Sequence, residues 1–372
     1  MARWHQLNSI RGRNRLVLTA VVLLVTFSIA TWWNGSGRQV PSSGEPHANL
    51  DRPEELDLAT LQDGVDGIPV LCYHYFRRGF APVYLLRVLG AVVLNLPTLG
   101  AKEYWTIPSA EFERHLRYFR DHGISVLTLD EVAAANRTGT PLPRPAVVIT
   151  IDDADASVYH LAFPLLREYG FRAHLFVPTA KVGKRWSGLE VCDWEQLRRM
   201  QESGVMIIDS HTHDLHWKIE TEGEWEPVLW HPEYLPDPGG MGTVTRSSDS
   251  PAETGTRTGA VGGPLQLQRA LAGPLNAVAK DLLTSRQALT DSVRREPHFL
   301  AWPYGFASDA LDSIAAATGF LGTLSLRPAA WHEEEAPWHI GRFGITAKTT
   351  LDQLAKMFLP PHGDKLLAGR AP

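Results

Sequence analysis

The sequence predicts an α/β protein: a distorted (β/α) barrel of about seven strands, preceded by an N-terminal hydrophobic anchor helix. Three observations favour this fold. From Ile68 onward, short apolar runs alternate with amphipathic runs of helical length. The short runs lack polar alternation, as parallel strands buried on both faces should. About seven such units in one domain favour a barrel over an open sheet.

The strands and helices can be assigned in chain order. We expect strands at 68–74, 124–129, 146–152, 172–179, 205–209, 298–302 and 320–326. We expect helices at 109–123, 130–139, 157–170, 193–204, 280–296 and 308–319. In the first helix, Ser109 is a candidate N-cap and Gly123 lies just past the end.

The N-terminus predicts a membrane segment. Residues 1–15 are basic, and the uncharged apolar run 16–33 ends in Trp32 and Trp33. We interpret 16–33 as a transmembrane anchor, which predicts a single-pass protein of the cell membrane with an extracytoplasmic domain. A cleaved signal peptide is the rival, because 28–30 reads small-x-small. Cleavage would make the protein periplasmic or secreted.

The remaining chain divides by composition. Residues 34–66 are rich in Gly, Ser and Pro and predict a linker. A catalytic domain is expected at 67–360, with a long surface insertion at about 217–275 and a tail at 361–372. The apolar stretch within 79–107 is either an extra element or a membrane-facing loop.

Charge and cysteine content exclude some classes. The net charge is -5 and the sequence pI is about 6.3, which argues against a nucleic-acid-binding surface. The two cysteines, Cys72 and Cys192, have no metal-motif spacing. We expect both to be small core residues.

Polar groups follow three of the predicted strands. Asp152 and Asp153 end one strand, "SHTHDLH" (210–216) follows a second, and "WPYG" (302–305) follows a third. Barrel enzymes place their chemistry at the carboxyl ends of strands, so these groups should share one face.

The side-chain types at these ends suit a metal hydrolase. Asp153 with two of His211, His213 and His216 supplies one carboxylate and two imidazoles, a set that binds divalent metals and leaves positions open. A bound metal lowers the pKa of water and polarises a carbonyl. The neighbouring Asp152 is then free to accept a proton as general base.

The order "TIDDAD", "SHTHDLH", "WPYG" resembles the NodB-type polysaccharide deacetylases, carbohydrate esterase family 4. The resemblance covers roughly 68–358 and includes "IPVLCYH" and "HIGRFGI". It is greatest to the poly-β-1,6-N-acetylglucosamine deacetylase branch, where the second His follows the first by five positions. The resemblance implies Asp153, His211 and His216 as metal ligands and Asp152 as catalytic base.

The resemblance also implies roles for residues elsewhere in the chain. The backbone N–H of Tyr304 would help to hold the oxyanion, and His74 matches the proposed general acid of the branch. Arg342 is a candidate to orient the base. Trp302 and Tyr304 are candidate substrate-binding residues. His213 is left outside the ligand set.

Several positions depart from the family pattern. Ala154 and Asp155 replace a Gly–aromatic pair, and Asp209 stands where Gly is usual. Asp155 adds negative charge that can raise the pKa of Asp152. Ala301 stands where many relatives carry Arg, so the base must find another partner.

The resulting functional hypothesis is a metal-dependent hydrolase that removes acetyl groups from hexosamines of an extracytoplasmic polysaccharide. N-acetyl groups are the favoured target, and an acetyl esterase acting on O-acetyl groups is the alternative. Zinc is the favoured metal, with nickel, cobalt or iron as alternatives. The expected partners are the polysaccharide and the membrane. Two rivals stay open: a membrane-anchored glycan-binding protein with a decayed site, and a non-heme metal oxygenase using the same ligand triad.

Overall fold

The computed structural model describes residues 64–79, 102–221, 224–231, 235, 276–332 and 334–359. These residues all belong to one compact unit. The predicted anchor at 16–33, almost all of the linker and the tail lie outside them, as do 80–101 and most of the insertion. Within the described ranges, no helix has the length and apolar character needed to cross a membrane.

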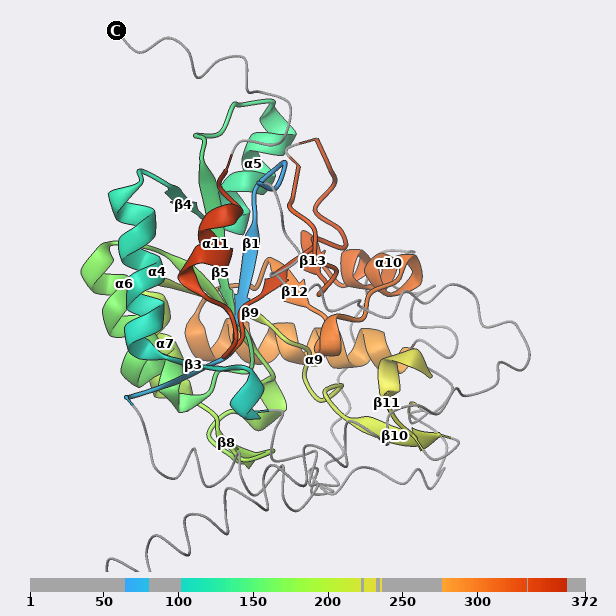
Figure 1. Ribbon diagram of the computed structural model, residues 1–372. Helices are drawn as coiled ribbons and strands as arrows, with labels where there is room; N and C mark the ends of the chain where they lie inside the picture. The colour runs from blue at the N-terminus through green and yellow to red at the C-terminus, as the bar shows by residue number, and fades with distance from the viewer. Residues whose placement is uncertain are drawn as a thin grey trace, which may run out of the picture. The chain divides into compact units, whose positions relative to one another are not determined.

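A parallel sheet forms the centre of the domain (Figure 1). Seven strands follow one path: β13 (Gly322–Leu324), β12 (Phe299–Ala301), β9 (Met206–Ser210), β6 (Ala173–Val177), β5 (Ala146–Ile151), β1 (Val70–Tyr73) and β14 (Phe343–Gly344). An eighth strand, β4 (Ser125–Leu127), pairs with β5. The α/β class and the parallel arrangement of about seven strands are confirmed.

One irregular segment links the two ends of this strand path. Ile340 exchanges backbone hydrogen bonds with Thr323 and Ser325 at the end of β13, each 2.9 Å long. Three residues later, Phe343 of β14 pairs with Leu71 of β1. We call this segment, residues 337–344, the closure segment.

Helices connect the strands and cover the sheet (Figure 1). They are α4 (Ser109–Asp121), α5 (Leu129–Thr138), α6 (Phe163–Tyr169), α7 (Trp194–Glu202), α9 (Asn276–Val293), α10 (Asp309–Ala317) and α11 (Leu351–Lys356). A π-helical turn, η2 (Val158–Ala162), precedes α6.

Local sequence explains where these helices begin and end. Thr128 and Glu131 form a capping box at the start of α5, and Gly139 ends it with a left-handed φ of 66°. The prediction of Ser109 as an N-cap is wrong, because Pro108 is the extended residue before α4 and Ser109 is already helical.

Strand residues alternate between two buried surfaces. Val70, Val148, Phe176 and Phe299 belong to one cluster inside the barrel, whereas their strand neighbours, such as Leu71, pack against the helices in the other clusters. The alternation continues past the strand ends. Residues two or four positions after an interior strand residue therefore lie over the carboxyl end of the barrel. The predicted chemistry is located at that end.

Three small ribbons extend the domain beyond the prediction. They are β2 (Tyr75–Arg77) with β3 (Thr106–Pro108), β7 (Arg185–Trp186) with β8 (Leu189–Glu190), and β10 (Lys218–Thr221) with β11 (Glu224–Pro227). The last ribbon and η4 (Val228–Trp230) form the front of the expected insertion. Ile219 and Val228 are buried there in an apolar cluster with α9 and α10 residues, so this part is not a surface loop.

Candidate active site

Asp152 directly follows β5 and is 2% exposed. Its backbone N–H donates to the Tyr73 carbonyl, which continues the pairing with β1 for one more residue. Arg342 donates two hydrogen bonds to the carboxylate, from Nη1 to Oδ1 at 2.7 Å and from Nη2 to Oδ2 at 2.9 Å. This fork is the bidentate geometry that makes arginine–carboxylate pairs strong.

Arg342 comes from the closure segment and is 1% exposed. Its Nε donates to the Ser325 carbonyl at 2.9 Å, which fixes the plane of the guanidinium. Relatives were expected to supply an arginine at position 301, where this chain has Ala301. The partner that the base lacks there is provided by Arg342 instead.

The ion pair determines the charge state of Asp152. Burial alone would raise the pKa of this carboxyl, but interactions led by the Arg342 guanidinium outweigh burial and hold it well below its usual range. The expectation that Asp155 raises this pKa is therefore wrong for the net shift. Asp155 is itself engaged, because it accepts from the Ser157 N–H at 3.0 Å and pairs with Lys102 at 3.5 Å.

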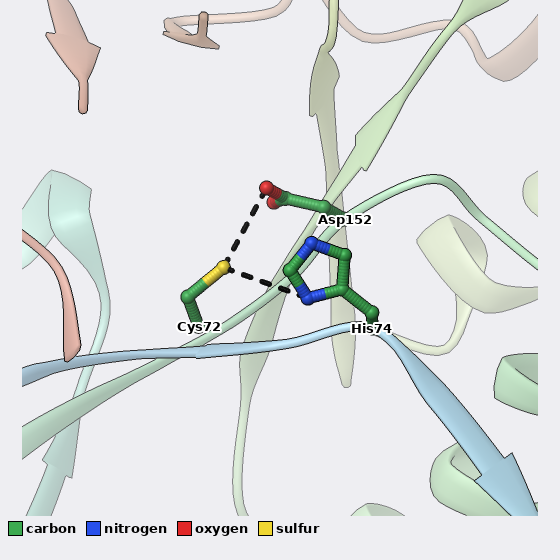
Figure 2. Close-up of side chains that lie close together, drawn as sticks. All are labelled: Cys72, His74 and Asp152. Atoms are coloured by element: carbon green, nitrogen blue, oxygen red, sulfur yellow. Dashed lines mark hydrogen bonds between the residues drawn. The ribbon is translucent and has the colours of Figure 1, made fainter. Parts of the chain in front are cut away.

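Cys72 and His74 lie beside the base (Figure 2). The Cys72 thiol donates to Asp152 Oδ2 at 3.5 Å and lies 4.0 Å from His74 Nδ1. Cys72 is fully buried, as expected for a core residue, but it also contacts the base. His74 is 9% exposed, and burial lowers its pKa despite the nearby carboxylates of Asp152 and Asp153.

A tryptophan covers the other side of His74. The Trp105 ring lies 4.3 Å from the imidazole, with 33° between the two planes. Trp105 directly precedes β3, in the segment 79–107 whose role the sequence left open. It is half-buried, so part of this residue is open to solvent.

Asp153 is turned away from the strand direction by a left-handed φ of 68°. The Tyr75 hydroxyl donates to Oδ2. The other oxygen, Oδ1, lies 3.6 Å from His211 Nε2 and 3.6 Å from His216 Nε2. Oδ1 is buried and accepts no hydrogen bond from any part of the chain that the structure describes. Three potential ligand atoms thus face one another around an unpartnered oxygen.

The two imidazoles are prepared to act as ligands. His211 Nδ1 lies 2.7 Å from the Ala301 carbonyl, which can only accept, so Nδ1 carries the proton and the Nε2 lone pair points to Asp153. Burial lowers the pKa of His216 to about 4, which keeps the ring neutral. Its ring lies 4.8 Å from Trp186 and 4.4 Å from Tyr304. This donor set fits a divalent metal.

His213 points elsewhere. Its Nδ1 lies 2.8 Å from the hydroxyl of Thr179. Of the three histidines that the sequence offered as ligands, the structure brings His211 and His216 to Asp153.

The "WPYG" segment places its two aromatic residues differently. Tyr304 is half-buried, has a left-handed φ of 58° and lies against His216, with Lys218 Nζ 5.0 Å from its ring centre. Trp302 is fully buried and donates through Nε1 to Asp312 at 2.9 Å. Trp302 therefore exposes no ring face on which a sugar could stack.

Asp209, one of the departures from the family pattern, serves the barrel interior. It is fully buried, bonded to His174 Nδ1 at 2.7 Å and to Arg295 Nη1 at 3.1 Å. Its carboxylate has partners on β6 and on the chain before β12, so it joins three parts of the sheet beneath the site.

Comparison with known proteins decides the family. The profile of the polysaccharide deacetylases matches residues 139–322, which include both aspartates, both candidate histidine ligands and the start of β13. The chain belongs to the polysaccharide deacetylase family. It is accordingly a hydrolase that acts on acetylated polysaccharide.

Curated relatives agree with this assignment. A poly-β-1,6-N-acetyl-D-glucosamine N-deacetylase of Staphylococcus aureus is 23% identical over 243 residues, 65% of this chain and 68% of the relative. The Staphylococcus epidermidis protein of the same name is 33% identical over 120 residues, 32% of this chain and 41% of the relative.

Solved structures share the fold. IcaB from Ammonifex degensii has a TM-score of 0.56 at 24% identity, covering 79% of this chain and 98% of that one. A de-N-acetylase from Aggregatibacter actinomycetemcomitans has a TM-score of 0.57 at 19% identity, and the match covers 78% of this chain and 100% of that one. The Streptococcus pyogenes deacetylase PplD gives 0.53 at 17% identity, with coverage of 80% and 100%.

Proposed function

We propose that this polysaccharide deacetylase is metal-dependent and removes N-linked acetyl groups from hexosamine residues of an extracytoplasmic polysaccharide. One observation carries the proposal. The ligand atoms of Asp153, His211 and His216 converge on a buried carboxylate oxygen that has no hydrogen-bond donor among the described residues. A buried carboxylate oxygen without a partner is costly, and a metal ion would satisfy it.

Asp153, His211 and His216 would hold the metal. Two imidazole nitrogens and one carboxylate oxygen suit zinc best, and nickel, cobalt or iron also fit this set. When bound, such an ion lowers the pKa of water and polarises the acetyl carbonyl.

Asp152 is proposed as the general base. Its carboxylate is ionised at neutral pH because Arg342 holds the pKa well below its usual range, so it can accept a proton from the attacking water. The fork of Arg342 also fixes the orientation of the carboxylate. A base with so low a pKa accepts a proton poorly from free water. Beside a metal ion held by Asp153, the pKa of the attacking water would be lower, so that this weak base could deprotonate it.

Tyr304 and His74 are proposed to complete the reaction. The backbone N–H of Tyr304 would donate to the tetrahedral oxyanion, an interaction typically worth about 10²–10³ in rate. His74 would protonate the leaving amine. Burial keeps its imidazole neutral at neutral pH, so His74 must gain a proton within the reaction cycle before it can donate one.

The proposed substrate class is a β-1,6-linked N-acetylglucosamine polymer, because relatives carrying that name match most of this chain. The half-buried Trp105 beside His74 offers an aromatic surface of the kind on which sugar rings stack. Trp302 is given no such role because of its burial.

The proposed location is the outer side of the cell membrane, with residues 16–33 as anchor or cleaved signal. This rests on the basic and apolar N-terminal pattern alone. The rival functions lose support at the site. An oxygenase with this ligand triad would usually have a β-helical scaffold, whereas this sheet is parallel and helix-covered. A decayed binding protein would lack ligands or base, and none is missing.

The test is acetate release from β-1,6-linked N-acetylglucosamine oligomers by the full chain, metal-free and then with Zn²⁺, Co²⁺ or Ni²⁺. We expect release only with metal. Asp152→Asn should lower the rate by about 10²–10⁴-fold while metal binding persists. Release that is equal in the presence of a strong chelator would disprove the metal dependence, and Asp152→Asn at wild-type rate would disprove the base.

A further inference from the structure

The loop between the two candidate histidine ligands has no regular structure of its own. It runs from His211 to His216 and includes Thr212 at a left-handed φ of 67°. We call residues 211–216 the ligand loop. Because a zinc–nitrogen bond is only about 2.0–2.1 Å long, the separation of the two imidazoles must be held to a fraction of an ångström. Something outside the loop has to fix it.

Helix α9 holds the ligand loop through a single carboxylate. Asp281 Oδ1 accepts the backbone N–H of His213 at 2.7 Å, and Oδ2 accepts the backbone N–H of Asp214 at 2.7 Å. Both oxygens therefore bind successive peptide groups midway between the two ligands. Hydrogen bonds to an ionised carboxylate are about twice as strong as neutral ones.

One turn later on the same helix face, a serine holds the beginning of the loop. Ser285 is fully buried, donates to the Thr212 carbonyl at 3.2 Å and lies 2.8 Å from the Ser210 hydroxyl. Residues four apart on a helix lie one above the other, so Asp281 and Ser285 present one polar stripe to the loop.

The opposite side of the loop is held by η3 (Thr179–Lys181). The backbone N–H groups of Thr179 and Ala180 donate to the carbonyls of Thr212 and His213, at 3.2 and 3.0 Å. Lys181 also pairs with Asp214 at 2.8 Å. The loop is clamped between η3 and α9, and Asp281 is the charged group on the α9 side.

We propose that Asp281 is a positioning residue, which sets the separation of His211 and His216 and thereby the metal affinity of the site. The inference rests on the proposed metal site but goes beyond it, since Asp281 contacts neither ligand side chain. Burial raises the pKa of Asp281 to about 7, against the effect of the two backbone N–H groups. The positioning role of Asp281 therefore rests on its two hydrogen bonds to the loop and not on its charge.

The test compares Asp281→Asn with a matched variant, Asp312→Asn. Asp312 is also a buried helix carboxylate, which accepts from Trp302 at 2.9 Å and Thr323 at 2.8 Å and pairs with His339 at 2.9 Å, but it does not contact the ligand loop. Each full-length protein is stripped of metal. Zn²⁺ affinity is then measured by competition with a chelator, and stability of the metal-free form by urea.

We expect both variants to lose stability, but only Asp281→Asn to lose Zn²⁺ affinity, by about 10–100-fold. The Co²⁺ absorption spectrum should change in that variant alone. If Asp281→Asn does not fold, Ser285→Ala serves in its place, with the same direction and a smaller loss. Equal Zn²⁺ affinity in wild type and in the loop variant overturns the inference and leaves the proposed site intact. A wild-type chain that binds no metal overturns both.

Discussion

Asp152 and Asp153 are neighbours in the chain with opposite surroundings. Asp152 continues the β5 direction into the barrel interior, where a fork from Arg342 and a thiol from Cys72 bind its two oxygens. Asp153 turns at a positive φ, has one oxygen bound by Tyr75 and leaves the other without a donor among the described residues. Identical side chains thus acquire different chemistry from their partners alone.

The comparison explains how a strand end divides two tasks. A carboxylate that must accept a proton has to stay ionised while buried, and a fixed cation achieves this. A carboxylate that must bind a cation cannot already have one. Arg342 is the fixed cation that keeps Asp152 ionised. Asp153 has no such arginine partner among the described residues, so its carboxylate can bind a metal ion.

The largest effect is expected from removing Arg342, the cation that pairs with Asp152. Arg342→Met should lower the free energy of unfolding by about 3–5 kcal/mol, because it leaves the charge of Asp152 buried and uncompensated. The pKa of Asp152 should rise, so deacetylase activity should be lost at a higher pH than in the wild type as pH falls. Urea unfolding and a pH–rate profile measure the two effects.

Arg295→Met is the control, since Arg295 pairs with another buried carboxylate, Asp209, and it donates to Ile208, Asp209 and Asp130 instead of Asp152. It should lower stability without moving the acidic limb of the pH profile. Identical pH profiles for the two variants would show that Arg342 does not tune the base.

A smaller effect is expected on the other aspartate. Tyr75→Phe removes the donor that orients Asp153 Oδ2 and should weaken metal binding by about 10–100-fold, as loss of a group that orients a ligand commonly does. Chelator competition measures this. Tyr73→Phe is the control, because that hydroxyl bonds to His115 at 3.0 Å instead. If both variants bind metal as the wild type does, Tyr75 does not orient the ligand.

The smallest effect is expected just after the pair. Ala154 is fully buried and has a φ of 52°, a conformation that glycine adopts without strain. Ala154→Gly should therefore stabilise the protein by about 0.5–1 kcal/mol in urea unfolding. Gly170→Ala is the reverse change and should lower the free energy of unfolding. Gly170 has a φ of 69° and open space around an added Cβ, so this variant tests the backbone strain alone. A destabilised Ala154→Gly would mean that methyl packing outweighs the strain.

The sequence was sufficient to locate seven strands of the central sheet and the residues at their ends, but not the direct pairing of β1 with β5 or the short strand β14. Asp152, Asp153, His211 and His216 each follow a strand whose apolar pattern is unambiguous, and parallel strands bring their carboxyl ends together. The same period of two places Cys72 and His74 inside the barrel. If the interior face of each strand is assigned first, this alternation also predicts the contact of Cys72 with Asp152.

Other features depend on geometry that no local pattern encodes. Arg342 was a candidate only through resemblance, because it comes from an irregular segment 190 residues after the base. The ring of Trp105 reaches His74 from a stretch whose apolar pattern fits no single element. Ser109 has the right chemistry for a cap but lies one residue inside the helix, because Pro108 fixes where the extended chain ends.

The closure segment has a consequence for the order in which the protein matures. Both aspartates and both histidines are synthesised long before residues 337–344, which link β13 to β1 and carry Arg342. A nascent chain that stops short of this segment holds every candidate ligand but has two open sheet edges and a base without its counter-charge. Completion of the barrel and activation of the base are therefore one event, and a partly made chain should not be a partly active enzyme.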